Sequence, residues 1–218
     1  MILKFFVLAI LQCMTLDDSI LALGDSYTIG EGVEVNDRWP IQMVKQLNEQ
    51  GKSFSTPKII AKTGWTTDEL QAAIQQQELA EKYDWVTLLV GVNNQYRERD
   101  LDEYRTQFYE LLKLAIEKAG NKPERVIVLS IPDWGGTPFA VKRNRDPALI
   151  AKQIDQFNQV NRGVSKELKV NYIDITQLTR DAAGNPSKFL VADELHPSAE
   201  MYKQWATMAS QVILNQGK

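Results

Sequence analysis

The chain has 218 residues, with 25 basic and 28 acidic side chains and a formal net charge of −3. This length suits one domain with a full hydrophobic core, and the near balance of charge excludes an obvious footprint for nucleic acid. The single cysteine, Cys13, excludes an internal disulfide, and one cysteine with one histidine is too few for a structural zinc site. Any catalysis that uses an imidazole must therefore use His196.

The N-terminal segment, residues 1–16, resembles a secretory signal. Lys4 precedes an unbroken apolar run over residues 5–11, which is shorter than the roughly 20 residues that span a bilayer. No small-x-small cleavage site follows, and Gln12 before Cys13 argues against a lipoprotein signal. We expect this segment to direct export to the periplasm or the extracellular space, or to tether the protein to a membrane. The alternative is an apolar segment folded onto a cytoplasmic domain.

From residue 17 onward, short apolar runs alternate with longer amphipathic patterns. The runs predict buried strands at residues 20–23, 58–61, 85–90, 125–131 and 170–175. The amphipathic patterns predict helices at residues 36–50, 66–82, 101–119, 150–168 and 199–212. This alternation predicts one α/β domain over residues 17–218, with a parallel sheet and helices on both faces. Ligands of such sheets bind beyond the carboxyl ends of the strands.

A serine follows the first predicted strand, in Gly24-Asp25-Ser26-Tyr27. Gly24 lets the backbone turn, so that the hydroxyl of Ser26 can project from the edge of the sheet as a nucleophile must. A turn or capping role for Ser26 is the alternative. We interpret Asp25 as a local hydrogen-bonding residue that holds the turn, not as a catalytic acid.

The single histidine lies in Asp193-Glu194-Leu195-His196-Pro197, just before the last predicted helix. Pro197 keeps His196 in an extended conformation, and Asp193 can orient one ring nitrogen while the other faces Ser26. Asp174, at the end of the fifth strand, is a competing partner, and a structural role for the histidine is a further alternative. Because a general base must be neutral, turnover by this pair should fall at acid pH.

Two further strand ends carry possible donors to an oxyanion. Gly64 follows the second strand in Thr63-Gly64-Trp65, where a backbone N–H could approach a substrate closely. Asn93 follows the third strand in Gly91-Val92-Asn93-Asn94, and its side-chain amide could donate directly. Each residue could also serve only a turn.

Taken together, these blocks resemble, in order and spacing, those of the SGNH (GDSL-type) hydrolase family over residues 17–218. The resemblance implies a flavodoxin-like three-layer α/β/α sandwich with a five-stranded parallel sheet, and a serine esterase that needs neither a metal nor an organic cofactor. The implied roles are Ser26 as nucleophile and backbone oxyanion donor, Gly64 and Asn93 as further donors, His196 as base, and Asp193 as its orienting carboxylate.

Substrate choice is expected to depend on the long loop at residues 132–147, which carries Trp134 and Phe139 and cations at positions 142, 143 and 145. We predict that Trp134 and Asn94 contact the substrate, with Trp65 and Arg97 at the rim. The glycines at 135 and 136 would give the loop the freedom of a lid. A solvated loop with one aromatic anchor is the alternative. Tyr27, where the family name has leucine, bears on substrate preference.

The expected partner is a small-molecule ester, with no nucleic acid and no metal, and with membrane association only through residues 1–16. A short-chain carboxylesterase, a lysophospholipase or thioesterase, and a carbohydrate O-deacetylase all fit these residues. Two non-enzymatic alternatives are a flavodoxin-like binding module and an inactive SGNH scaffold. No G-x-G-x-x-G or P-loop pattern follows any predicted strand, which disfavours a nucleotide-binding module.

Overall fold

The structure is a computed structural model that describes residues 17–216. The predicted export segment, residues 1–16, lies outside the described residues, so that prediction and the domain boundary at residue 17 stay predictions. No helix of the described part is both long and apolar enough to cross a membrane.

Five parallel strands form one sheet in the order β2-β1-β3-β4-β5. The strands are β1 (Ile20–Gly24), β2 (Lys58–Ala61), β3 (Trp85–Leu89), β4 (Val126–Leu129) and β5 (Asn171–Ile173). This is the strand order of flavodoxin-like sheets, in which the chain reverses direction across the sheet between β1 and β3. The predicted fold class is confirmed.

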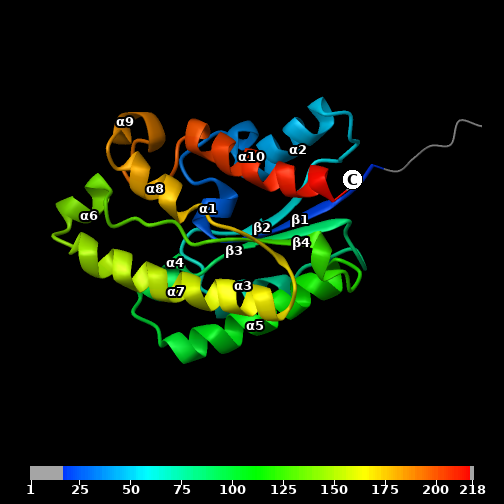
Figure 1. Ribbon diagram of the computed structural model, residues 1–218, viewed down its shortest axis with the longest axis horizontal. Helices are drawn as coiled ribbons and strands as arrows, with labels where there is room; N and C mark the ends of the chain where they lie inside the picture. Colours follow the sequence, from blue (N-terminus) through cyan, green and yellow to red (C-terminus); the bar gives the residue numbers. More distant parts are fainter. Residues whose placement is uncertain (1–16, 217–218) are drawn as a thin grey trace, which may run out of the picture.

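Two helical layers cover the sheet (Figure 1). On one face α2 (Trp39–Glu49) packs against α10 (Ala199–Asn215), and on the other α5 (Leu101–Lys118) packs between α3 (Thr67–Gln75) and α7 (Pro147–Glu167). The remaining elements are short: α1 (Ser26–Ile29), α4 (Val92–Tyr96), α6 (Pro138–Lys142), α8 (Thr176–Ala182), α9 (Pro186–Phe189) and the 3₁₀ turns η1 (Val35–Asp37) and η2 (Pro123–Arg125).

The long helices begin at capping residues that the sequence supplies. Asp100 accepts hydrogen bonds from the first turn of α5, and Asp146 does the same for α7, where Pro147 occupies the first helical position. Thr66 and Glu69 form a reciprocal capping box at the start of α3. These caps satisfy backbone N–H groups that have no partner within the helix.

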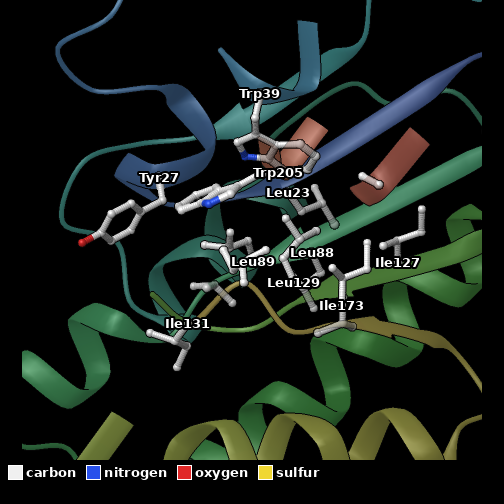
Figure 2. Packing of buried hydrophobic residues seen from close by; sticks show 14 of the residues in the cluster. Leu23, Tyr27, Trp39, Leu88, Leu89, Ile127, Leu129, Ile131, Ile173 and Trp205 are labelled. Atoms are coloured by element: carbon white, nitrogen blue, oxygen red, sulfur yellow. The ribbon is translucent and has the colours of Figure 1, made fainter. Parts of the chain in front are cut away.

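The core on the α2–α10 side is built around two buried tryptophans. Trp39 from α2 and Trp205 from α10 lie over the sheet near Leu23 of β1 (Figure 2). Burying a side chain of this size stabilises the fold by about 2–3 kcal/mol. The ring of Tyr27, in α1, lies 6.1 Å from that of Trp205, so this core also holds the short helix that carries Ser26.

Element boundaries differ from the predictions in all five long helices: α5 ends at Lys118, α7 begins at Pro147 and α10 ends at Asn215. The predicted helix over 66–82 ends at Gln75, because the apolar stripe of Leu70 and Ile74 would require apolar residues at 77 or 78, where the sequence has Gln and Glu. The predicted helix over 36–50 starts at Trp39, because Pro40 is tolerated only in the first turn. The third, fourth and fifth strands are each one or more residues shorter than predicted.

Candidate active site

The predicted strand-end residues meet at one cavity at the carboxyl edge of the sheet. Ser26, Gly64, Asn93 and His196 all line this cavity, which has a volume of about 210 Å³. Ser26 follows β1 and Asn93 follows β3, the two strands between which the sheet order reverses. The site therefore occupies the position where parallel α/β sheets bind their ligands.

A tight turn between β1 and α1 holds Ser26, which is 4% exposed. Asp25 caps α1, and its Oδ1 accepts a hydrogen bond of 3.0 Å from the backbone N–H of Tyr27, which confirms its predicted role in the turn. A Cβ atom on Gly24 would lie 2.2 Å from Oγ1 of Thr28 and 2.5 Å from the carbonyl oxygen of Leu89. Glycine is thus required at position 24 because there is no space for a side chain. The sequence indicates only its role in the turn.

The carboxyl group of Asp25, the residue before Ser26, is fully buried. Burial raises its pKa to about 7, against the opposite effect of backbone hydrogen bonds from Tyr27 and Gly91. Its Oδ2 has no hydrogen-bond partner among the described residues. Asp25 therefore holds a proton at pH values where an ordinary carboxyl is charged.

Asp193 is the carboxylate partner of His196. Its Oδ2 lies 2.6 Å from Nδ1 of His196, and its Oδ1 accepts the backbone N–H groups of Leu195 and His196, each at 2.9 Å. Partial burial acts to raise the pKa of Asp193, but these hydrogen bonds outweigh it and the pKa lies below its ordinary value. Nε2 of His196 takes no part in this contact, and His196 itself lines the cavity.

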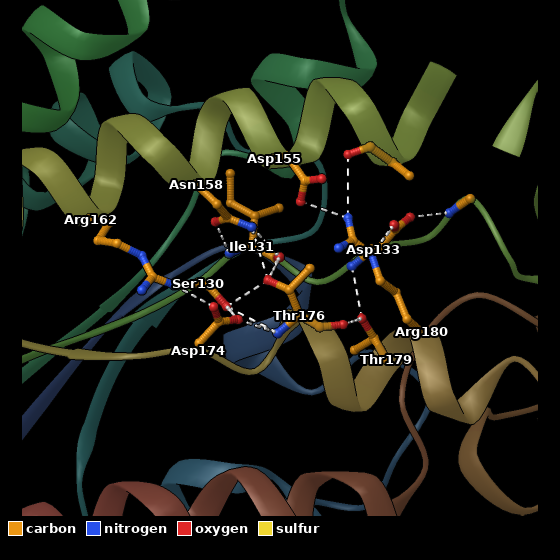
Figure 3. A network of polar contacts seen from close by, with 12 residues as sticks. Ser130, Ile131, Asp133, Asp155, Asn158, Arg162, Asp174, Thr176, Thr179 and Arg180 are labelled. Atoms are coloured by element: carbon orange, nitrogen blue, oxygen red, sulfur yellow. Dashed lines mark hydrogen bonds and ion pairs between the residues drawn. The ribbon is translucent and has the colours of Figure 1, made fainter. Parts of the chain in front are cut away.

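The competing carboxylate, Asp174, lies elsewhere. Its Oδ2 pairs with Nη2 of Arg162 at 2.5 Å, and its Oδ1 accepts from Oγ of Ser130 and from the backbone N–H of Thr176 (Figure 3). The alternative left open by the sequence is therefore settled in favour of Asp193, because only Asp193 shares a turn with the histidine.

Both candidate oxyanion donors lie at the cavity. Gly64 has φ +87°, a conformation that favours glycine, and its carbonyl accepts a hydrogen bond of 2.5 Å from Arg97. The Asn93 amide donates one N–H to the carbonyl of Trp65 at 3.0 Å. Because an amide carries two N–H groups, Asn93 has a second one for a ligand.

The predicted substrate contact of Asn94 is wrong. Asn94 is 1% exposed and does not line the cavity. Its Oδ1 accepts the backbone N–H of Thr67, and its Nδ2 donates to the hydroxyl of the same residue at 2.7 Å. Asn94 thus joins α4 to the start of α3. Neither Trp65 nor Arg97 lines the cavity. Arg97 does donate a hydrogen bond to the carbonyl of Gly64, which lines it.

Trp134 lines the cavity as predicted, within an apolar wall completed by Val92, Tyr96, Phe139 and Leu195. Sequence reasoning did not single out Val92, Tyr96 or Leu195. All three lie within three residues of Asn93 or His196, so scanning the neighbours of each strand-end block would have found them. Tyr27 also lines the cavity, with its ring 5.3 Å from that of His196.

The loop at 132–147 is more ordered than predicted. It contains α6, and its cations contact neighbouring side chains: Lys142 pairs with Glu194, Arg143 lies 3.6 Å over the ring of Phe139, and Arg145 lies 5.8 Å from that of Trp134. The glycines at 135 and 136 lie in confined space. An added Cβ at 136 would lie 2.8 Å from Cβ of Ala183, too close without a shift, and one at 135 would lie 3.0 Å from the carbonyl oxygen of Pro147, a tight contact. They are therefore no argument for a lid.

Across residues 17–216 no group of three or more metal-ligating side chains comes together. A serine, a histidine paired with aspartate, and candidate oxyanion donors at the carboxyl edge of a parallel sheet are the arrangement of a serine hydrolase. Residues 22–204 match the GDSL-like Lipase/Acylhydrolase family, and the chain belongs to that family.

Comparison with individual proteins agrees with this family. An acetylxylan esterase of Geobacillus stearothermophilus is 23% identical over 144 residues, a match that spans 62% of this chain and 62% of that enzyme. A lipase/acylhydrolase from Enterococcus faecalis superposes with a TM-score of 0.68 at 22% identity, covering 91% of this chain and 96% of that one. The psychrotrophic esterase EstA from Pseudoalteromonas sp. gives 0.67 at 18% identity, covering 92% and 98%. At these identities the structural likeness shows the fold.

Proposed function

We propose that the chain hydrolyses small carboxylic esters through an acyl-enzyme formed on Ser26. The observation that carries the proposal is the hydrogen-bonded pair of Asp193 and His196 beside the cavity that Ser26, Gly64 and Asn93 also line. Family membership supports ester bonds as the target.

In the proposed mechanism, Nε2 of His196 takes the proton of Ser26 as the hydroxyl attacks the ester carbonyl. The oxyanion accepts hydrogen bonds from the backbone N–H groups of Ser26 and Gly64 and from the Asn93 amide. His196 then protonates the departing alcohol. Water hydrolyses the acyl-enzyme with the same base, and Asp193 stabilises the imidazolium in both steps.

The cavity favours a short acyl group. Its volume of about 210 Å³ exceeds the roughly 150 Å³ cavity that holds a benzene molecule, so it has room for an acyl group of about six heavy atoms. Trp134 and its apolar neighbours suit the hydrocarbon part of the acyl group. The similarity to an acetylxylan esterase also supports a short acyl group and makes an acetylated carbohydrate one ester to test.

The test is release of p-nitrophenol from acetyl, butyryl, hexanoyl and octanoyl esters. Replacing Ser26 with alanine should lower kcat by at least about 10⁴-fold, because the nucleophile and its base act as a unit. Ser55→Ala, at an exposed serine outside the cavity, is the matched control and should keep wild-type turnover. Equal turnover by Ser26→Ala and the wild type would overturn the proposal.

We also propose that residues 1–16 direct export. The support is Lys4 followed by the apolar run over residues 5–11. Fractionation of cells that express the full chain should place the protein outside the cytoplasm, and replacing two leucines of the run with arginine should retain it inside. Cytoplasmic protein in both cases would contradict export.

A further inference from the structure

The backbone on either side of Trp134 is held by one buried carboxylate. The Asp133 side chain is 3% exposed, and its Oδ1 accepts the backbone N–H of Gly135 at 2.8 Å. Its own backbone N–H donates to Oγ1 of Thr179 at 2.9 Å (Figure 3). Asp133 and Gly135 flank Trp134, so these hydrogen bonds fix the backbone from which the indole projects.

Arg180, from α8, neutralises that carboxylate. Its Nε donates to Oδ2 of Asp133 at 2.8 Å, and its Nη2 donates to Oδ1 of Asp155 on α7 at 2.7 Å. The Arg180 side chain is 31% exposed, whereas that of Asp133 is buried. A buried carboxylate without its partner is strongly unfavourable, so the turn depends on this arginine.

The indole N–H of Trp134 is held by a second set of hydrogen bonds. Nε1 of Trp134 donates to Oε1 of Gln95 on α4 at 2.8 Å, and Nε2 of Gln95 donates to Oε1 of Gln153 at 2.8 Å. Gln153 and Asp155 both belong to α7, two residues apart. One helix therefore anchors Trp134 at two points, through Arg180 at the backbone and through Gln95 at the indole N–H.

Neither Arg180 nor Asp133 lines the cavity. We propose that Arg180 is a positioning residue for substrate specificity: through Asp133 it keeps the Trp134 indole in place as the wall that limits the length of the acyl group. This inference rests on the proposed ester hydrolysis, with the acyl group against Trp134. A wall held in place discriminates against an extra methylene, whereas a wall that can swing away accepts it.

The test uses the ratio of kcat/KM for p-nitrophenyl octanoate to that for the acetate. A loss of folded protein lowers both values equally and leaves the ratio unchanged, so the ratio separates positioning from a general structural role. Arg180→Met should raise the ratio by about tenfold, because each methylene in an apolar pocket changes selectivity by at least that factor. Arg180→Lys keeps a cation for Asp133, so its ratio should lie closer to that of the wild type than the ratio of Arg180→Met does.

Two further variants serve as controls. One tests whether misfolding changes the ratio, and the other tests whether the loss of any nearby ion pair changes it. Asp133→Asn combined with Arg180→Met removes the unpaired buried charge and should raise the ratio as well. Arg162→Met breaks the neighbouring pair with Asp174, which does not reach Trp134, and should leave the ratio unchanged. An equal rise in this control would overturn the proposal.

Trp134→Ala distinguishes two ways in which the inference can fail: Arg180 has no positioning role, or Trp134 is not the wall that limits acyl length. If it raises the ratio while Arg180→Met and the double variant do not, Arg180 has no positioning role and ester hydrolysis stands. If Trp134→Ala also leaves the ratio unchanged, the wall assignment fails and the inference with it. The activity of Ser26→Ala tests ester hydrolysis itself, independently of these ratios.

Discussion

At the scale of single residues, the site combines two aspartates with opposite electrostatic environments. Asp193 is ionised more readily than an ordinary carboxyl because His196 and two backbone N–H groups donate to it. Asp25, fully buried beside Ser26, ionises less readily. The G-D-S and D-x-x-H motifs therefore use the same residue type for different purposes: a neutral cap in the first, and a charged partner of the imidazole in the second.

Asp25→Asn should change how stability depends on pH. In the unfolded chain this carboxyl ionises near pH 4, whereas in the folded protein it keeps its proton until about pH 7. Between these values the folded state binds more protons, so this group lowers the free energy of unfolding as the pH rises. From pH 5 to pH 8 the free energy of unfolding of the wild type should fall by about 2–3 kcal/mol relative to that of Asp25→Asn.

Urea denaturation of both proteins at pH 5, 6, 7 and 8 measures this difference. Comparing the two proteins at each pH cancels the contributions of Asp193 and of the other titrating groups. Two stability curves that run parallel across this range would show that Asp25 is ionised in the folded protein throughout.

At the scale of elements, the position of Ser26 depends on how closely α1 approaches the sheet. Helix α1 has only four residues, and Gly24 allows Thr28 and the backbone of Leu89 to lie against the end of β1. The ring of Tyr27 then reaches both Trp205 and His196. Ser26 is thus placed by packing against β3 and α10, which lie far from it in the sequence.

Gly24→Ala should displace α1, because the carbonyl of Leu89 is backbone and has little room to move. We expect a loss of about 1–3 kcal/mol in stability from overpacking and, for a displacement near 1 Å, about a 10²-fold loss in kcat. Thermal unfolding and ester turnover measure the two effects.

The matched control is Gly163→Ala, in α7, where an added Cβ meets no atom within 4 Å. That change should stabilise the protein by about 1 kcal/mol and leave kcat unchanged, because alanine is the better helix former. If both variants kept wild-type kcat, close approach at Gly24 would have no part in placing Ser26.

At the scale of the whole molecule, the site lies where the sheet changes direction. After β1 the chain crosses to the face that carries α2, and after β3 to the face that carries α5, so the turns that follow β1 and β3 diverge and leave room for a ligand. His196 reaches the same place from the segment before α10, about 170 residues after Ser26 in the chain. The site therefore forms only when the sheet and both helical layers are assembled.

Removal of residues 1–16 should leave the domain intact, because residues 17–216 contain the sheet, both helical layers and the cavity. We expect Tm to change by less than about 2 °C, which corresponds to less than about 1 kcal/mol for a chain of this length. Ester turnover should equal that of the full chain. A clear fall in Tm would instead support the alternative in which the apolar segment is packed onto the domain.

The sequence alone was sufficient for features that depend on short-range patterns. Alternating periodicity predicts the parallel sheet, and a capping aspartate marks the start of α5. Pro197, directly after the D-E-L-H segment, predicts that His196 stays outside a helix. Asp193 could be proposed as the partner of His196 because three residues in one turn bring the two side chains together. Such signals are read from neighbouring residues, and the structure bears them out.

Only the tertiary structure decided which way the loop side chains face. It directs Asn94 inward to Thr67, pairs Asp174 with Arg162 away from the site, and holds Trp134 between Gln95 and Arg180. It also shows how little room surrounds Gly24, Gly135 and Gly136. The physical reason is that turn propensities depend on a few adjacent residues, whereas the direction of a side chain and the room around a glycine depend on neighbours dozens of residues away.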